Sequence, residues 1–445
     1  MIRVKNDVYP LLRLVLPLAL TGLIQSTIWF FGTMFLAHLG ADILAAGSLV
    51  SWLFGTLVVV IVGTLSSINI LVALKFGAKD EQAIWEVVRD GLWLAVLFSI
   101  PTFLLIWNIS PLFILFGQTP TIVQLAQPYL HSLAPGILPN LILIALLEVL
   151  MGLGQARLIL FCSIMSVSLT IFFSFAFIFG KFGFANLGIA GAGWGLTLSN
   201  WITLFVLASF LFTNKEYRGY FRLIIKPTKS NYLVELLKIG IPMGLMFCVE
   251  VAFFFALTLI MGSFGSLVMA ANQIAFQYLG SLMAVIFSLA QAITVRMGHL
   301  LGAGKRNAAV RSAYVAVSFS ILFMLITALG YWLFSIQLIS LDFDVHAPEN
   351  KQIIDFARQF LMVCAIFQIV EAIRITLFGT LRALKDTQFT LIISIISFWG
   401  ISFPLGYLLA FNFELGPIGF WWGMVIGAST SVLLLFWRFK SKIAV

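Results

Sequence analysis

Twelve hydrophobic runs follow one another from end to end of this 445-residue chain. Each is long enough, at about 20 residues or more, for an α-helix to cross the ~30 Å hydrocarbon core of a bilayer. Lipid offers the backbone no hydrogen-bond partners, so such runs must be helical. Only 10% of the residues are charged, whereas a soluble domain carries about 25%. The sequence therefore predicts an all-α polytopic membrane protein.

The basic residues are distributed unevenly around these runs. We place the spans at 11–38, 45–75, 88–112, 124–150, 157–180, 188–213, 236–262, 268–300, 310–336, 355–381, 387–410 and 416–438. Of the 26 Lys and Arg residues, 22 lie at the termini or near loops that follow even-numbered spans. Basic loops stay on the cytoplasmic side, so we predict that both termini and these loops are cytoplasmic. The net charge of +9 is then a topology signal, and it does not indicate nucleic-acid binding.

The N-terminal run and the three cysteines have structural explanations. The chain starts with basic residues, as a signal peptide does, but no small-residue cleavage site follows, which indicates a retained first span. Cys162, Cys248 and Cys364 lie in apolar runs without a CxxC motif or a nearby histidine. We expect buried free thiols there, and neither a disulfide nor a metal site.

The two halves of the chain resemble each other. Five short segments of the first half recur in the same order in the second half, at offsets of 225 to 228 residues. The matches pair Pro17 with Pro242, Gly40 with Gly265, Gly77 with Gly302, Gly152 with Gly379, and residues 188–195 with 416–423. Each half has six spans, so the copies share one orientation and are related by a pseudo-two-fold axis along the membrane normal. We predict an N-terminal lobe (1–213), a cytoplasmic linker (214–235) and a C-terminal lobe (236–445), with a cleft between the lobes as in alternating-access transporters.

Four segments of the second half carry a resemblance to a known family. They are FCVEVAFFF (247–255), AANQIAFQYLGSL (270–282), ITVRMGHLLGAGKR (293–306) and VEAIRITLFGTLRALKDT (370–387). Over essentially its whole length the chain resembles the multidrug and toxic compound extrusion (MATE) family, most closely its NorM-like bacterial branch. The resemblance implies a V-shaped, two-lobed fold with a central cleft, in the inner membrane of a bacterium. It also implies export of lipophilic, often cationic compounds, driven by inward movement of Na⁺ or H⁺. We expect a monomer without a cofactor.

Three ionisable residues lie deep inside the predicted spans, namely Glu250 in span 7 and Glu371 and Arg374 in span 10. Charges are costly in lipid, so such residues are functional hypotheses by default. Glu250 lies about 16 Å deep at 1.5 Å of rise per residue. A carboxylate at that depth must be protonated, paired or bound to a cation. The resemblance implies a cation-binding acid at Glu250 and another at Glu371, where relatives usually carry Asp. The alternative is a protonated Glu250 that only joins helices.

Arg374 is spaced along its helix to pair with Glu371. Side chains at i and i+3 are neighbours, and a helical side chain leans toward the N-terminus of its helix. Relatives usually carry a neutral residue, often Gln, at the position of Arg374. The arginine is therefore either a working counter-ion that stabilises Glu371 as the anion or a purely structural partner. Asn272 and Gln273 supply amide oxygens nearby, or simply join helices. Glu250 and Glu371 are predicted to bind protons, or Na⁺ transiently and weakly.

The N-terminal lobe lacks a matching acid. Relatives carry an Asp in the first span, within a VDT-like sequence, whereas WFFGTMFLAHLG (29–40) has Gly32 at that position. In the repeat, Gln25 aligns with Glu250 and keeps the polarity without the charge. Glu148 lies near the inner end of span 4, and we interpret it as structural. The coupling role is therefore predicted to lie in the C-terminal lobe.

Aromatic side chains near these polar residues are the candidates for the walls of the cleft, because soft apolar surfaces suit varied substrates. The predicted substrate-cleft residues are Phe253, Phe254, Phe276, Phe367 and Gln25. The expected partners are small lipophilic or cationic compounds and membrane lipid, with no nucleic acid.

These observations favour a cation-coupled multidrug efflux antiporter. The alternative is a lipid-linked saccharide flippase of the same superfamily, which needs several cavity arginines for pyrophosphate, whereas only Arg374 lies at depth. An intramembrane enzyme is disfavoured, because the spans contain no HExxH motif, no close Asp pair and no Ser/His arrangement. A major-facilitator carrier also has twelve spans, but the loop after span 2 lacks that superfamily's basic signature. We therefore predict a transporter and not an enzyme.

Overall fold

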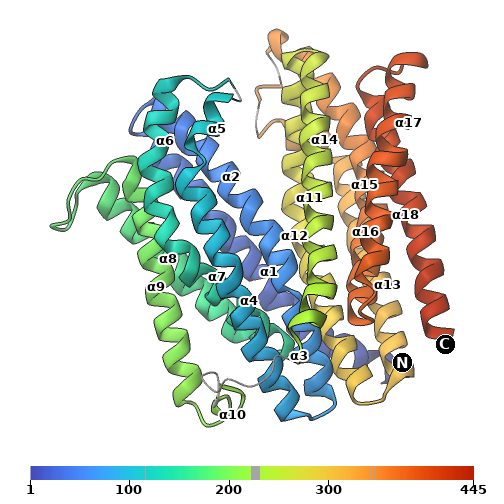
Figure 1. The fold of residues 1–445 in the computed structure, drawn as a ribbon. Helices are drawn as coiled ribbons and strands as arrows, with labels where there is room; N and C mark the ends of the chain where they lie inside the picture. The colour runs from blue at the N-terminus through green and yellow to red at the C-terminus, as the bar shows by residue number, and fades with distance from the viewer. Residues whose placement is uncertain (1, 116, 222–230, 342, 346, 445) are drawn as a thin grey trace. The chain divides into compact units, whose positions relative to one another are not determined.

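The computed structural model describes residues 2–115, 117–221, 231–341, 343–345 and 347–444, and the side chains of these residues except 2–7, 349 and 444. Within these ranges the regular structure is entirely helical (Figure 1). Twelve stretches are long and apolar enough to cross a membrane, which confirms the predicted number. Most predicted bounds agree to within a few residues. The exception is the span predicted at 88–112, which runs from Glu81 to Asn108 because the Asp80 carboxylate caps its first turn by accepting from the Ala83 N–H at 3.1 Å.

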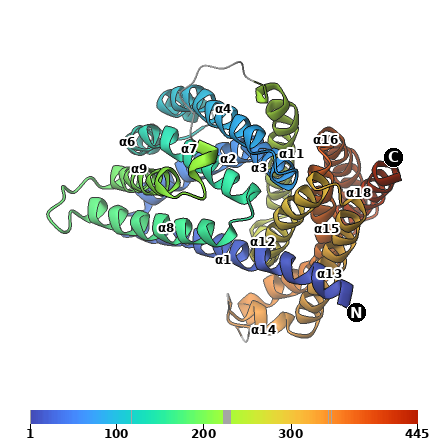
Figure 2. The same cartoon turned by 90° about the horizontal axis from the view of Figure 1, so that it is seen from below.

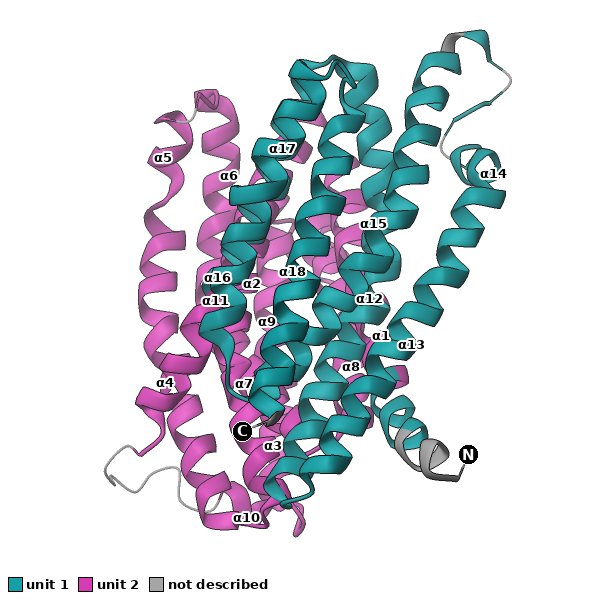
Figure 3. Ribbon diagram, turned by 90° about the vertical axis from the view of Figure 1, so that its right-hand side faces the viewer, with its two compact units in different colours: residues 1–15, 245–445 teal, residues 16–244 magenta. Residues whose placement is uncertain are grey.

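The chain forms two compact units, coloured in Figure 3. Unit 2 comprises residues 16–244, and unit 1 comprises residues 1–15 and 245–445. Unit 2 holds most of α1 (Ile2–Ala37), then α2 (Ala41–Leu65), α3 (Ser67–Gly77), α4 (Glu81–Asn108), α5 (Ser110–Leu115), α6 (Pro120–Leu133), η1 (Ala134–Gly136), α7 (Ile137–Gly152), α8 (Ala156–Phe179), α9 (Ile189–Thr213) and α10 (Arg218–Phe221). The predicted lobe bounds stay a prediction, and residues 222–230 of the predicted linker lie outside the described residues.

Unit 1 is built around one central helix, α15. Its elements are most of α11 (Leu233–Ser263), then α12 (Ser266–Gly302), α13 (Arg306–Leu333), α14 (Ser335–Ile339), η2 (Pro348–Asn350), α15 (Lys351–Ala383), α16 (Thr387–Ile395), the π-helix η3 (Ile396–Ser402), α17 (Phe403–Tyr407), the π-helix η4 (Leu408–Asn412) and α18 (Ile418–Ala444). α15 packs against α12, α13 and α18 (Figure 2). This central position buries Glu371 and Arg374 of α15 among neighbouring helices.

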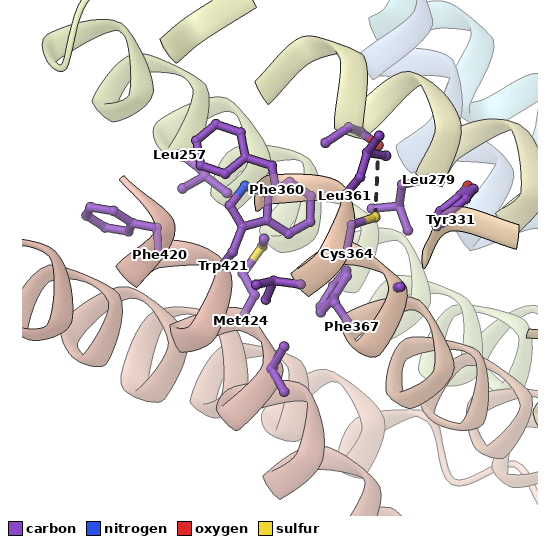
Figure 4. Close-up of a cluster of buried hydrophobic side chains, with 14 of the residues drawn as sticks. Leu257, Leu279, Tyr331, Phe360, Leu361, Cys364, Phe367, Phe420, Trp421 and Met424 are labelled. Carbon is purple, nitrogen blue, oxygen red and sulfur yellow. Dashed lines mark hydrogen bonds between the residues drawn. The ribbon is translucent and has the colours of Figure 1, made fainter. Parts of the chain in front are cut away.

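An aromatic core fixes α15 within unit 1 (Figure 4). Trp421 of α18 is fully buried, and its ring centre lies 6.2 Å from that of Phe360 and 6.3 Å from that of Phe367, both on α15. The Cys364 thiol of α15 points to the Ala275 carbonyl of α12 at 4.0 Å. Between helices in lipid, close packing of this kind replaces the exclusion of water as the main attraction.

The repeat predicted from the sequence recurs in local backbone conformation. Gly40 caps the start of α2 at φ 117° and ψ 163°, and Gly265 caps the start of α12 at φ 115° and ψ 162°. Side chains with a Cβ atom rarely adopt such angles, which explains why both positions are glycine. Lys79 and Gly304, which follow the paired helix ends at the same offset of 225, also share a positive φ, of 58° and 71°. The symmetry axis and the cleft between lobes stay predictions.

At least three predicted spans are interrupted rather than regular, and the one at 124–150 contains the 3-10 turn η1. The span predicted at 387–410 changes from α- to π-helix at η3, just before Pro404, whose missing N–H prevents a regular α-helical ladder there. The span predicted at 45–75 breaks at Ser66, between α2 and α3. The Ser66 hydroxyl donates both to the Val62 carbonyl at 2.8 Å and to the Glu148 carboxylate at 3.0 Å.

Candidate functional site

The three deep ionisable residues meet inside unit 1. Glu371 and Arg374 lie one turn apart on α15, and Glu250 faces them from α11. The Arg374 Nε atom donates to Glu371 Oε2 at 2.8 Å, and its Nη2 atom donates to Glu371 Oε1. The Nη1 atom donates to Glu250 Oε1 at 2.8 Å. One guanidinium therefore joins two helices through a two-pronged ion pair on its own helix and a single ion pair on the other.

Aromatic rings enclose the guanidinium from two elements. The Cζ atom of Arg374 lies 4.7 Å from the ring centre of Phe378 and 4.8 Å from that of Phe398. The ring of Phe398 in turn packs on Phe253, with centres 4.8 Å apart. Only 1% of the arginine side chain is exposed. Cation–π contacts are strongest where water is excluded, so these rings help to hold the charge in the interior.

The two carboxylates differ in how far they are engaged. Both oxygens of Glu371 accept from Arg374, and the side chain is 6% exposed. Glu250 is 12% exposed, and its Oε1 atom also accepts from the Ser394 hydroxyl at 3.3 Å. Within the described part of the chain, no donor reaches the other oxygen of Glu250. Glu250 is therefore the member of the cluster that is free to change partners.

The π-helix η3 positions one side of this cluster. Ser394 precedes it, Phe398 lies within it, and the Trp399 indole donates to the Val249 carbonyl at 3.1 Å, directly beside Glu250. The interruption in α16–α17 therefore brings a hydroxyl, an aromatic ring and a tether to one turn of α11. π-helical turns inside longer helices occur frequently at functional sites. The sequence signals were Pro404 and the clustered serines, but neither predicts which turn they will face.

The predicted amide ligands lie outside the charged cluster. Asn272 is buried, and its Oδ1 atom accepts from the Trp421 indole at 3.1 Å. Gln273 is exposed on the same helix, α12. Neither amide is in hydrogen-bond contact with Glu250, Glu371 or Arg374 among the described residues, and their coupling role stays a prediction.

The predicted cleft residues fall into three environments. Phe253 and Phe367 are fully buried in the aromatic core of unit 1, whereas Phe254 and Phe276 are half-buried and contact each other with ring centres 5.7 Å apart. Gln25 lies in unit 2, exposed at the wall of a cavity. A substrate-binding role of all five residues stays a prediction.

The cavity in unit 2 has a volume of about 360 Å³ and was not predicted from the sequence. Its walls combine aromatic residues such as Trp29 and Trp52 with the amides of Gln25, Asn140 and Asn200. None of the described residues that line it is an Asp, Glu, Lys or Arg. Gly32, which takes the place of the acid expected in relatives, belongs to this wall. The buried hydroxyls of Ser163 and Thr203 also line it, and neither finds a hydrogen-bond partner in the described structure.

Glu148 occupies a structural position in unit 2. It is buried on α7, where it accepts from the Ser66 hydroxyl at 3.0 Å and from the Asn69 amide. These bonds connect α7 to the break between α2 and α3. The carboxylate gives two buried side-chain donors their partners, which is compatible with a structural role, and that role stays an interpretation.

Comparison with known proteins places this geometry in a family. The MatE family model matches residues 17–176 and 242–408. A multidrug resistance protein NorM of Burkholderia vietnamiensis is 33% identical over 431 residues, which cover 97% of this chain and 93% of that protein. A probable multidrug resistance protein NorM of Brucella suis biovar 1 (strain 1330) is 30% identical over 438 residues, with 97% and 93% covered.

Solved structures share the fold at lower identity. A crystal structure of MATE in the bent conformation gives a TM-score of 0.90 at 19% identity and covers 100% of this chain and 98% of that one. The outward-facing conformation of a multidrug resistance MATE family transporter of the MOP superfamily gives a TM-score of 0.88 at 20% identity, covering 98% and 96%. The predicted all-helical transporter fold is confirmed by this likeness.

Proposed function

Because the chain belongs to the MATE family, we propose that it is a cation-coupled multidrug efflux antiporter. As a member of that family it is a multi-pass membrane protein and not an enzyme, as the sequence predicted. It exports lipophilic, often cationic compounds by alternating access, and inward movement of Na⁺ or H⁺ drives the export. It works in the bacterial inner membrane with both termini in the cytoplasm, as a monomer.

The coupling step is proposed for the cluster of Glu250, Glu371 and Arg374. The observation that supports it most strongly is the position of Glu250. Its side chain is mostly buried, one carboxylate oxygen accepts from Arg374, and the other has no donor in the described structure. A charged carboxylate in this environment is unfavourable, because it has lost most of its hydration. It therefore responds strongly to any cation that reaches it, which is what coupling requires.

The cavity of unit 2 is proposed as a place where the exported compound binds. The exposed faces of Trp29 and Trp52 attract organic cations without a fixed negative charge, and the amide side chains orient polar groups. A neutral, aromatic wall also binds varied compounds with modest affinity, because binding does not depend on one matched ion pair. Substrate binding and ion coupling are then assigned to different units of the chain.

The cavity does not favour the flippase alternative. Holding a pyrophosphate requires several converging arginines or lysines. No such residue lies among the described residues of the cavity wall in unit 2. In unit 1, the cationic group of Arg374 is already bound by two carboxylates.

Transport in proteoliposomes tests the proposal. The full chain is reconstituted, and transport of the fluorescent cation ethidium is followed under an imposed Na⁺ gradient, an imposed proton gradient, or neither. We expect at least one of the two gradients to drive ethidium against its own gradient, relative to protein-free liposomes. Ethidium movement that is the same with and without both gradients would overturn the antiport assignment.

A further inference from the structure

We propose that Arg374 is a built-in counter-cation that fills the cation site between Glu250 and Glu371, so that Na⁺ does not bind there and export by this protein is independent of Na⁺. That export is independent of Na⁺ rests on the proposed function. That Na⁺ does not bind at this site concerns binding alone and does not depend on the proposed function.

The oxygens that a metal cation would need are already engaged. A hard cation binds through several oxygen ligands at once. Both oxygens of Glu371 and the Oε1 atom of Glu250 accept from the guanidinium of Arg374. Only one carboxylate oxygen of the pair is left, on Glu250. The two carboxylates therefore act as ligands of Arg374 and not as an open site.

The nearest predicted amide ligand is engaged elsewhere. The Oδ1 atom of Asn272 accepts from the buried Trp421 indole at 3.1 Å, in the aromatic core. Recruiting it would leave a buried indole N–H without its partner, which is costly in the interior. The Ser394 hydroxyl does reach the cluster, at 3.3 Å from Glu250, but one hydroxyl and one carboxylate oxygen do not make a cation site.

The guanidinium is held too firmly for Na⁺ to displace it. Arg374 is 1% exposed, bonded through three donor atoms and enclosed by the rings of Phe378 and Phe398. An arginine does not lose its proton in proteins, so its charge stays in place through the transport cycle. Like charges in a low-dielectric interior repel strongly, so Na⁺ beside this guanidinium is disfavoured.

The charge balance shows what the arginine leaves available. Two carboxylates and one guanidinium carry one net negative charge. Of the two carboxylates, Glu250 accepts fewer hydrogen bonds from Arg374 than Glu371 does. A transport cycle at this cluster then has a single negative charge to neutralise. Arg374 is in this sense a specificity-determining residue, because it sets which cations the cluster accepts.

Binding of ²²Na⁺ to the purified full chain tests directly whether Na⁺ is excluded from the site. We expect no saturable Na⁺ binding by the wild type. Arg374→Gln, which removes the charge and keeps a long polar side chain, is expected to bind Na⁺ saturably, at least about tenfold above the wild-type background, because it frees three carboxylate oxygens and removes the repelling charge. Arg374→Lys keeps the charge and is expected to bind no Na⁺. The matched control is Arg438→Gln, which removes an ion-paired arginine elsewhere in unit 1 and is expected to match the wild type.

Two results would overturn the inference. One is saturable Na⁺ binding by the wild type that is lost in Glu371→Gln. The other is a well-folded, monodisperse Arg374→Gln protein that binds no more Na⁺ than the wild type. If Arg374→Gln does not fold, the wild type and Arg374→Lys decide the matter, since Na⁺ binding by either contradicts the inference and its absence from both supports it.

A transport measurement separates this inference from the proposed function. We expect proton-driven ethidium transport by the wild type to be the same in Na⁺-free and Na⁺-containing buffer. Ethidium transport driven by a Na⁺ gradient alone would overturn the inference and leave the antiporter assignment standing. No transport under either gradient would overturn the antiporter assignment, and the ²²Na⁺ result would still decide the occupancy of the site.

Discussion

At the scale of single residues, the site depends on matching one buried guanidinium to two carboxylates. A buried ion pair is not stabilising in itself, because desolvating the charges offsets their attraction. Its members nevertheless depend on each other, since removing one leaves another charged and unpaired in the interior. Arg374 serves two such partners, Glu371 and Glu250, so its loss is more serious than the loss of either acid.

Arg374→Gln is expected to destabilise unit 1 by about 3–5 kcal/mol, because it leaves two carboxylates without a counter-charge in the interior. Adding Glu371→Gln to this variant is expected to recover part of the loss, because one of the uncompensated charges is removed. Thermal melting of the purified proteins in detergent gives the comparison.

The control for this comparison of the single and double variants is Arg438→Gln. Arg438 pairs with Asp386 at 2.7 Å but is 31% exposed, so we expect a loss of at most about 1 kcal/mol. The assigned charge pairing would be contradicted if Arg374→Gln had the same melting temperature as the wild type, or if the double variant were less stable than Arg374→Gln.

Part of this cluster could be predicted from the sequence, and part could not. The pairing of Glu371 with Arg374 follows from spacing along one helix. The second ion pair, from Arg374 to Glu250, depends on how α11 and α15 pack, and no spacing rule carries that information across 124 residues. The roles of Ser394 and Phe398 were missed for the same reason, because a serine and a phenylalanine in an apolar run look like ordinary packing residues.

At the scale of elements, the close approach of α12 and α15 supports the site. The Thr294 hydroxyl of α12 donates to the Gly379 carbonyl of α15 at 2.8 Å, and a Cβ atom at Gly379 would meet the Ala290 carbonyl and the Ile293 side chain. The long hydrophobic runs of the sequence predicted both helices. It did not predict the π-helix η3 or the break at Ser66, because a changed hydrogen-bond register leaves the apolar character of a span unaltered.

Gly379→Val is expected to destabilise unit 1 by about 1–3 kcal/mol, because the new side chain forces α12 and α15 apart. The matched control is Gly330→Val on α13, where a Cβ atom meets no other atom within 4 Å. Thermal melting of both purified variants is the measurement. Equal melting temperatures for the two variants would show that the helices do not depend on this contact.

At the scale of the whole molecule, the number of spans and the duplication were accessible from the sequence. Span number follows from composition and length, and the duplication left paired glycines such as Gly40 and Gly265, whose conformations agree. The cavity of unit 2 was not accessible, because its wall draws neutral residues from many helices. The absence of an acid at Gly32 is the one sequence feature that agrees with the uncharged wall of this cavity.

The orientation of the chain is a prediction at this scale. Alkaline phosphatase, which is active only outside the cytoplasm, is fused after Lys181 or after Asn214, in the loops that follow spans 5 and 6. We expect activity from the fusion at Lys181 and none from the fusion at Asn214, because basic residues concentrate near the second loop. The reverse pattern would place both termini outside.

The most direct test of the central claim is gradient-driven ethidium transport by Glu250→Gln in proteoliposomes. Inward Na⁺ and proton gradients are imposed together, so that the result does not depend on the coupling ion. The control is Glu414→Gln, the same chemical change at an exposed residue of unit 1. We expect Glu250→Gln to fall to the level of protein-free liposomes and Glu414→Gln to match the wild type. Full transport by a folded Glu250→Gln protein would contradict the assignment of coupling to this cluster.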